Sequence, residues 1–311
     1  MSQHSRKRLT SGKKAILGVS ALAASGLAVG LLVTPSAVAE GTGAAEALKQ
    51  NEAAVADAKA AKSAAPKSLA ARSAGSTVLS GVTVNGGNSA AVGTKNTQTI
   101  TVKWKLSGGS TLYGSHASLW RGTDSDSDSD SGLERFITSE QFNAGTEPCA
   151  PSGDATFDCT ATFKIDPRID LSNEDAGAWK IRLWAVTDAT TGVDTENART
   201  WYLQRWSRLS NNAAPEPVAK GKTITITGKL ERANWDTYTY TGYTQQIVHL
   251  QERSLTGSYA TTSSHRTGTG SQAGVEKKTR TATTDRCYRY AFEGTSTTPP
   301  VNGTGDCVDV R

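Results

Sequence analysis

The chain has 311 residues, of which 34 are Lys or Arg and 29 are Asp or Glu. Residues 1–14 hold five of the basic residues and no acid, and the rest of the chain has 29 residues of each sign. The positive excess therefore belongs to the amino terminus. No basic surface remains that would predict a nucleic acid or an acidic membrane as a partner.

Residues 1–39 have the order of a secretory signal peptide. The basic start is followed by an apolar stretch over residues 15–33 and by the A-x-A cleavage site at residues 37–39. The alternative is a retained anchor, because 19 apolar residues approach the length of a bilayer span. Several Gly and Ser residues dilute the stretch and favour cleavage after Ala39. We expect a secreted, extracellular protein without membrane contact after cleavage.

Residues 40–75 are rich in Ala, with scattered Lys and Glu and no aromatic residue. Helix propensity is high, but no apolar stripe is present that could pack on a core. This composition predicts a low-complexity linker or pro-segment that is largely disordered or partly helical.

Residues 76–208 are rich in β-branched and aromatic residues, and apolar residues alternate with polar ones, as in Ile100 to Leu106. No segment of this region has convincing helical periodicity. About six short strands predict one antiparallel β-sandwich. Further candidate strands are Thr77–Val84, His116–Trp120, Thr156–Ile165 and Thr200–Trp206.

An acidic run interrupts this first module: Asp124, Asp126, Asp128 and Asp130 alternate with Ser. Calcium prefers six to eight oxygen ligands on a tightly turned loop. The run lacks the Gly and Glu spacing of such a loop, and alternate carboxylates of an extended chain diverge. We expect a solvated insertion, with a weak calcium site as the alternative and no other metal or cofactor.

Six of the seven tryptophans lie in this first module. Trp104 and Trp179 share their strand faces with aliphatic residues, which predicts burial. Trp184 falls on the opposite phase of its strand. Trp184 and Trp206 are therefore a candidate outward patch, suited to gripping a protein or stacking on a sugar ring. The alternative is that both pack on the neighbouring module or on the acidic insertion.

The polar, Pro-containing stretch SNNAAPEPVAKGK, residues 210–222, predicts a boundary near Ser210 and a second module over residues 209–311. Alternating apolar residues recur in KTITITGKL, QIVHLQ and CYRYAFEG. About 100 residues of this pattern predict a second sandwich.

The stretch EPVAKGKTITITGKLERANWDTYTYTGYTQQIVHLQER, together with the carboxyl-terminal FEGTSTTPPVNGTGDCVDVR, resembles immunoglobulin-like modules of secreted actinobacterial proteins that are mostly uncharacterised. The resemblance covers residues 211–311, and the upstream module resembles the domain that often precedes them. It implies a β-sandwich and export, and it implies no catalytic residue. The sequence thus predicts an all-β chain of two tandem antiparallel, immunoglobulin-like modules.

Four cysteines occur in a chain that we expect to be exported: Cys149, Cys159, Cys287 and Cys307. An even number in an oxidising compartment predicts disulfides. Of three pairings we favour Cys149–Cys159 and Cys287–Cys307, because each then stays within one module. A zinc site is the alternative, but the wide spacing and the lack of nearby His argue against it.

We find no nucleophile or metalloprotease motif and therefore predict no catalytic residue. The first hypothesis is a non-catalytic secreted or cell-surface binding or structural protein. The second is a carbohydrate-binding protein that uses exposed tryptophans of the first module. The third is a hydrolase with an unrecognised site. The expected partner is an extracellular protein or a cell-wall glycan.

Overall fold

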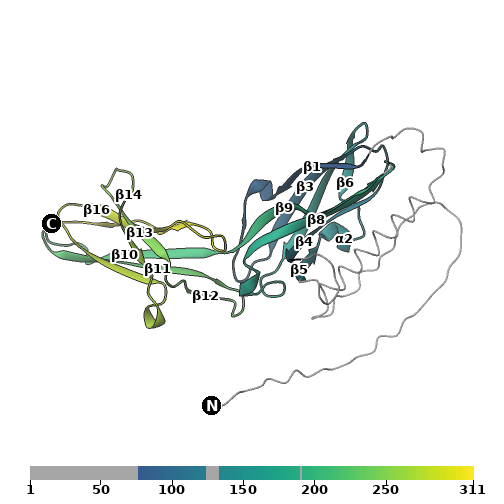
Figure 1. The fold of residues 1–311 in the computed structure, drawn as a ribbon. Coiled ribbons are helices and arrows are strands. Elements are labelled where there is room, and N and C mark those ends of the chain that lie inside the picture. Colours follow the sequence, from purple (N-terminus) through teal and green to yellow (C-terminus); the bar gives the residue numbers. More distant parts are fainter. Residues whose placement is uncertain (1–75, 124–132, 190) are drawn as a thin grey trace, which may run out of the picture. The chain divides into compact units, whose positions relative to one another are not determined.

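The structure is a computed structural model that describes residues 76–123, 133–189 and 191–311 (Figure 1). Most of these residues belong to β-strands, which agrees with the predicted all-β class. The predicted signal peptide, the Ala-rich segment and Asp124, Asp126, Asp128 and Asp130 lie outside the described residues. Within the described ranges, no helix has the length and apolar character of a membrane span.

Residues 76–205 contribute the strands of two sheets, here called the first sheet pair (Figure 1). All strand pairings are antiparallel except the parallel one between β2 and β9. One sheet has the order β1 (Val78–Val84), β3 (Gln98–Ser107), β7 (Thr156–Ile165), β6 (Cys149–Gly153). The other has the order β2 (Ala90–Val92), β9 (Val193–Arg205), β8 (Gly177–Thr187), β4 (Leu112–Gly122), β5 (Leu133–Thr138).

A large apolar cluster lies between the two sheets of the first pair. Ile100 and Trp104 of β3 are at most 2% exposed, and Trp179 of β8 is fully buried. These residues stand on alternate positions of their strands, so one face of each strand packs inward. The predicted burial of Trp104 and Trp179 is confirmed.

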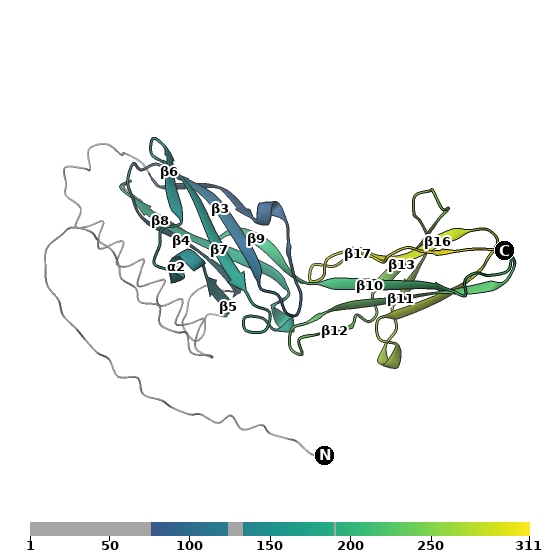
Figure 2. The same ribbon diagram turned by 180° about the vertical axis from the view of Figure 1, so that it is seen from behind.

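Residues 207–308 contribute the strands of two further sheets, the second sheet pair. Figure 2 shows β10 and β11 of this pair running side by side. One sheet has the order β10 (Ser207–Ala214), β11 (Thr223–Asn234), β12 (Thr239–Gly242), with β15 (Val275–Thr281) also paired to β11. The other has the order β14 (Ala260–Arg266), β13 (Ile247–Arg253), β16 (Arg286–Phe292), β17 (Val301–Asn302), with β18 (Asp306–Val308) also paired to β16.

A second apolar cluster fills the space between these two sheets. Ile224 and Ile226 of β11, Leu250 of β13 and Tyr290 of β16 are fully buried. The alternation read from the sequence therefore identifies the inward face of each of these strands.

Short helical turns connect some strands. Ser139 caps the four-residue helix α2 (Glu140–Asn143) by accepting a hydrogen bond from the Phe142 amide. The 3-10 turns are η2 (Asn85–Gly87), η3 (Asn173–Asp175) and η4 (Gly270–Gln272).

Both predicted disulfides are present. Cys149 of β6 is directly opposite Cys159 of β7, and Cys287 of β16 is directly opposite Cys307 of β18. Each bridge therefore joins two strands that are already hydrogen-bonded neighbours, and each closes a short stretch of chain.

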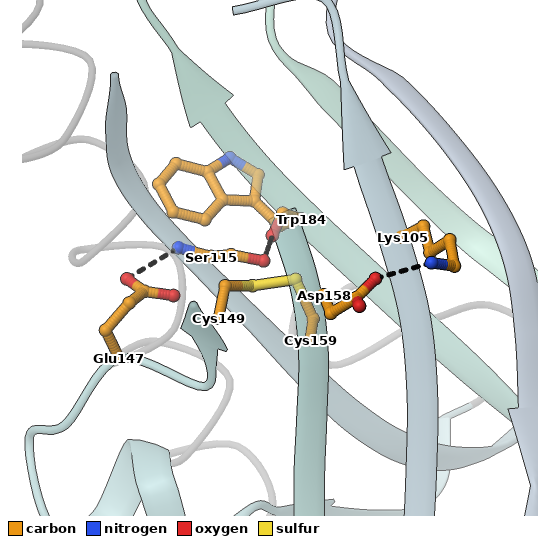
Figure 3. The surroundings of a disulfide bond; sticks show 7 residues. All are labelled: Lys105, Ser115, Glu147, Cys149, Asp158, Cys159 and Trp184. Carbon is orange, nitrogen blue, oxygen red and sulfur yellow. Dashed lines mark hydrogen bonds and ion pairs between the residues drawn. A yellow bond between two sulfur atoms is a disulfide. The ribbon is translucent and has the colours of Figure 1, made fainter. Parts of the chain in front are cut away.

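Figure 3 shows the surroundings of the Cys149–Cys159 bridge, where Glu147, two residues before β6, is hydrogen-bonded to β4. The Ser115 amide of β4 donates to the Glu147 carboxylate at 3.1 Å, and the Ser115 hydroxyl donates to the Trp184 carbonyl at 3.0 Å. Partial exclusion of water raises the pKa of Glu147 to about 7, against the effect of the amides of Ser115 and Cys149 that donate to it.

Candidate ligand-binding groove

Trp206 is the residue between β9 and β10, and its side chain points into solvent. Residues 201, 203 and 205 of β9 are buried, so the alternation places residue 206 on the exposed phase. Its amide donates to the Val92 carbonyl and its carbonyl accepts from the Ala233 amide, both at 2.8 Å. Trp206 is 50% exposed, although its backbone is fixed on both sides.

The turn between β11 and β12 is anchored by Trp235. This side chain is fully buried and belongs to the apolar cluster of the first sheet pair. Its indole N–H donates to the Gly93 carbonyl at 2.9 Å, and its amide donates to Asn173 at 3.0 Å. The anchored turn holds Tyr238, which is 46% exposed and whose hydroxyl donates to the Arg168 carbonyl.

These segments enclose an open groove of about 700 Å³. Aromatic, cationic and uncharged polar side chains all contribute to its lining. The lining residues are Ala91, Gly93, Thr94, Lys95, Asn96, Gln98, Trp206, Arg208, Tyr238, Thr239 and Tyr240.

Gly93 sets the width of the groove next to Tyr240. A Cβ atom on Gly93 would lie 3.2 Å from the Tyr240 hydroxyl oxygen, which is closer than side chains normally pack. A larger residue at this position would therefore require the Tyr240 side chain to shift.

Among the described residues that line the groove, two carry a cationic side chain and none carries a carboxylate. Arg208 donates through Nε to Glu231 at 2.8 Å, and its guanidinium lies 4.3 Å from the centre of the Tyr240 ring. Lys229 contacts the other oxygen of Glu231 at 2.8 Å. Burial opposes the ionisation of Glu231, but the two cations outweigh it and lower its pKa.

A buried arginine next to Trp206 in the sequence ties the end of β9 to β11. Arg205 is 6% exposed and donates through Nε to the Ala233 carbonyl at 2.6 Å. Burial lowers the pKa of Arg205 to about 10, and nearby Arg232 acts in the same direction while Asp236 acts in the other. At that pKa the guanidinium stays charged at neutral pH and fixes the backbone beside Trp206.

The predicted pair of exposed tryptophans is only half formed. Trp206 lines the groove, but Trp184 is 4% exposed, so the prediction that it is outward and accessible is wrong. The strand face predicted for Trp184 is nevertheless correct, because this side chain lies outside the main apolar cluster between the two sheets. The His116 ring, 4.9 Å away between centroids, and Val186 cover it instead.

Sequence reasoning missed Tyr238, Arg208 and Lys95 as groove residues. Trp206 and Arg208 are both exposed, because exposed and buried residues alternate from β9 into β10. Extending this alternation past the predicted boundary near Ser210 would have identified Arg208 from the sequence. Lys95 and Tyr238 lie in turns, where no periodic pattern indicates direction. In the ranges that the structure describes, no group of three or more His, Cys, Asp or Glu side chains is placed to hold a metal ion.

No family model and no curated protein matches the chain. Among solved structures it is similar to dimeric latent PorU from Porphyromonas gingivalis, with 11% identity, a TM-score of 0.27 and coverage of 79% of this chain and 21% of that chain. It is also similar to a mutant of Salmonella alpha-2-macroglobulin, with 12% identity, a TM-score of 0.24 and coverage of 76% and 15%. The chain thus spans about a fifth or less of the length of these neighbours.

Proposed function

We propose that the chain is a secreted, non-catalytic binding protein built of two tandem immunoglobulin-like β-sandwich modules, and that the groove is its ligand-binding surface. The proposal includes a signal peptide over residues 1–39 and a linker over residues 40–75. The four sheets with two apolar clusters support the module architecture. The two disulfides support export, because such bridges persist in oxidising compartments.

The exposed aromatic pair Trp206 and Tyr238 carries the assignment of the binding surface. Both rings line the same groove, and each is about half exposed. Two hydrogen bonds hold the backbone of Trp206, and the Tyr238 side chain is held by the bond from its hydroxyl to the Arg168 carbonyl. Large aromatic side chains that remain accessible on a fixed backbone are typical of recognition surfaces, because little entropy is lost when they bind.

A carbohydrate is the second candidate ligand, and the lining of the groove favours it. Thr94, Asn96 and Gln98 supply hydroxyl and amide groups next to the aromatic pair. Sugar rings present apolar C–H faces and hydroxyl edges, so they match a mixture of aromatic rings and uncharged polar groups.

The test is co-sedimentation of the purified exported chain with isolated cell walls, and capture from culture supernatant. We expect Tyr238→Ala and Trp206→Ala each to weaken binding by about tenfold, which corresponds to the loss of one good aromatic contact. Tyr202→Ala is the matched control, because Tyr202 is 42% exposed and does not line the groove.

Two results would contradict the proposal. One is binding that survives the loss of both groove aromatics. The other is equal weakening by the Tyr202 control, which would place the ligand on a different surface. Unchanged thermal melting of all three variants is required for either conclusion, because exposed substitutions normally alter stability little.

A further inference from the structure

We propose that the groove takes a saccharide chain that carries an acidic group, whether a carboxylate, a sulfate or a phosphate. Trp206 and Tyr238 would stack on sugar rings, and Lys95 and Arg208 would bind the acidic group. This inference rests on the proposed function and adds the chemical class of the ligand.

The stacking surface comes from two of the three aromatic residues in the groove. The Tyr240 ring is already covered by the Arg208 guanidinium at 4.3 Å. Trp206 and Tyr238 are 50% and 46% exposed, and among the described residues neither ring is part of an aromatic pair or lies beneath a cation. About half of each residue is therefore open to a flat, partly apolar ligand such as a sugar ring.

The charge of the groove selects an acidic ligand. Glu231 is shared between Arg208 and Lys229, so this group of three side chains keeps one uncompensated positive charge. Lys95 is exposed and makes no ion pair with any residue that the structure describes. None of the described lining residues carries a carboxylate, so an acidic substituent would meet Lys95 and the net positive charge of the group formed by Arg208, Glu231 and Lys229.

Arg208 also has the free donors that a carboxylate or sulfate needs. Only its Nε donates to Glu231, and the Nη groups donate to no described residue. The ring contact with Tyr240 and the Nε bond hold the guanidinium in place. A fixed guanidinium with two free Nη groups can bind an oxyanion in a bidentate manner.

The polar lining is equally unengaged. The side chains of Asn96 and Gln98 make no hydrogen bond within the described ranges, although both line the groove. Amides can both donate and accept, as the hydroxyl groups of a sugar require.

Single-stranded nucleic acid is also negatively charged and also offers rings that stack on aromatic side chains. The chain after residue 39 has equal numbers of acidic and basic residues, however, which disfavours binding of a polyanion of that charge density.

The experiment is a glycan array on which each uronic, sulfated or phosphorylated oligosaccharide is printed next to its methyl-esterified, desulfated or dephosphorylated parent. Oligothymidylate and poly-L-glutamate are printed as non-saccharide acids. The protein is the full exported chain, and the best ligand is then measured by calorimetry at two salt concentrations.

We expect binding to the acidic glycans at least about tenfold stronger than to their neutral parents, and weaker binding at high salt because surface charges are screened. Lys95→Gln should weaken binding of the acidic form by about threefold to tenfold more than binding of the neutral parent. Lys222→Gln is the matched control, since Lys222 is exposed and outside the groove lining. Trp206→Ala should weaken binding of both forms.

Equal binding of acidic and neutral forms, with loss in Trp206→Ala, would overturn the acidic specificity and leave the proposed function intact. Binding of oligothymidylate or poly-L-glutamate at the strength of the best glycan would overturn the saccharide assignment. An array without signal would also overturn the inference. The proposed function itself would fail only if cell walls and supernatant gave no groove-dependent binding either.

Discussion

The two sheet pairs differ in how their apolar clusters are completed. The first contains large indoles, among them Trp104, Trp179 and Trp201, and the second is built of aliphatic residues with Tyr and Phe. The only tryptophan after residue 209 is Trp235, and it is buried in the first cluster. The second cluster includes no residue before Leu209.

The first apolar cluster therefore depends on a residue that follows the second sheet pair's strand β11, but the second cluster does not depend on the first sheet pair. The first cluster needs the turn between β11 and β12 to be complete, whereas the second cluster closes with its own residues. The same turn carries Tyr238, so the completion of a core and the formation of the groove depend on one anchored segment. Four experiments test this difference between the two sheet pairs.

The largest effect is expected for Trp235→Ala. Removing a fully buried indole from the first cluster should lower the free energy of unfolding by about 3–5 kcal/mol, through lost burial and the cavity left behind. Urea unfolding measures the change. Trp206→Ala is the control and should cost no more than about 0.5 kcal/mol, because that indole is exposed. Equal costs for the two variants would show that Trp235 does not complete the first cluster.

The second prediction compares the two bridges. Replacing Cys149 and Cys159 by Ser, or Cys287 and Cys307 by Ser, should each cost about 2–4 kcal/mol. The second pair should cost roughly 0.6 kcal/mol more, because its sequence separation is 20 against 10 and loop-closure entropy grows with length. Unfolding of both double variants in urea tests the order, and a clearly larger cost for the first pair would contradict it.

The third prediction concerns acid and the first sheet pair. Burial lowers the pKa of His116 from 6.5 to about 4, against the pull of Asp194 and together with Arg182. The unfolded chain therefore binds this proton more readily, and stability falls as the pH drops from 6.5 to 4. In His116→Phe, the free energy of unfolding should fall by roughly 1–3 kcal/mol less between pH 6.5 and pH 4 than in the parent chain.

Unfolding of His116→Phe and the parent chain is compared at pH 8, 6 and 4. The difference at pH 8 measures the packing change alone, because the imidazole is neutral there. The expected result is convergence or inversion of the two stabilities at pH 4. Parallel curves over the whole range would show that His116 does not titrate in this window.

The smallest effect is expected at the surface. Lys105 and Asp158 lie 2.7 Å apart but are 66% and 56% exposed, so their coupling in a double-mutant cycle should be below about 0.5 kcal/mol (Figure 3). The pair Arg208 and Glu231 in the second sheet pair should couple more strongly, because the Glu231 side chain is 14% exposed. A reversed order would indicate that exposure does not control these ion pairs.

The strands and bridges could be predicted from the sequence because their signals are local. Alternation identifies β7 and β11, and pairing within each module identifies both disulfides. The groove could be predicted only in part. The exposure of Trp206 follows from the alternation along its strand, but the burial of Trp184 depends on His116 of the neighbouring strand. Tyr238 lies in a turn that Trp235 anchors to Gly93, which is 142 residues earlier in the sequence. Alternation gives a side chain's face, not what covers it.

The exposure of Trp206 gives the protein an optical reporter at its candidate site. All seven tryptophans lie in the described ranges, and the other six are at most 4% exposed. A small aqueous quencher therefore reaches one indole of seven, and the emission it removes comes from the groove. Iodide, as an anion, is further drawn there by Lys95 and Arg208. Occupancy of the groove can thus be followed by fluorescence in the unlabelled, unmutated chain.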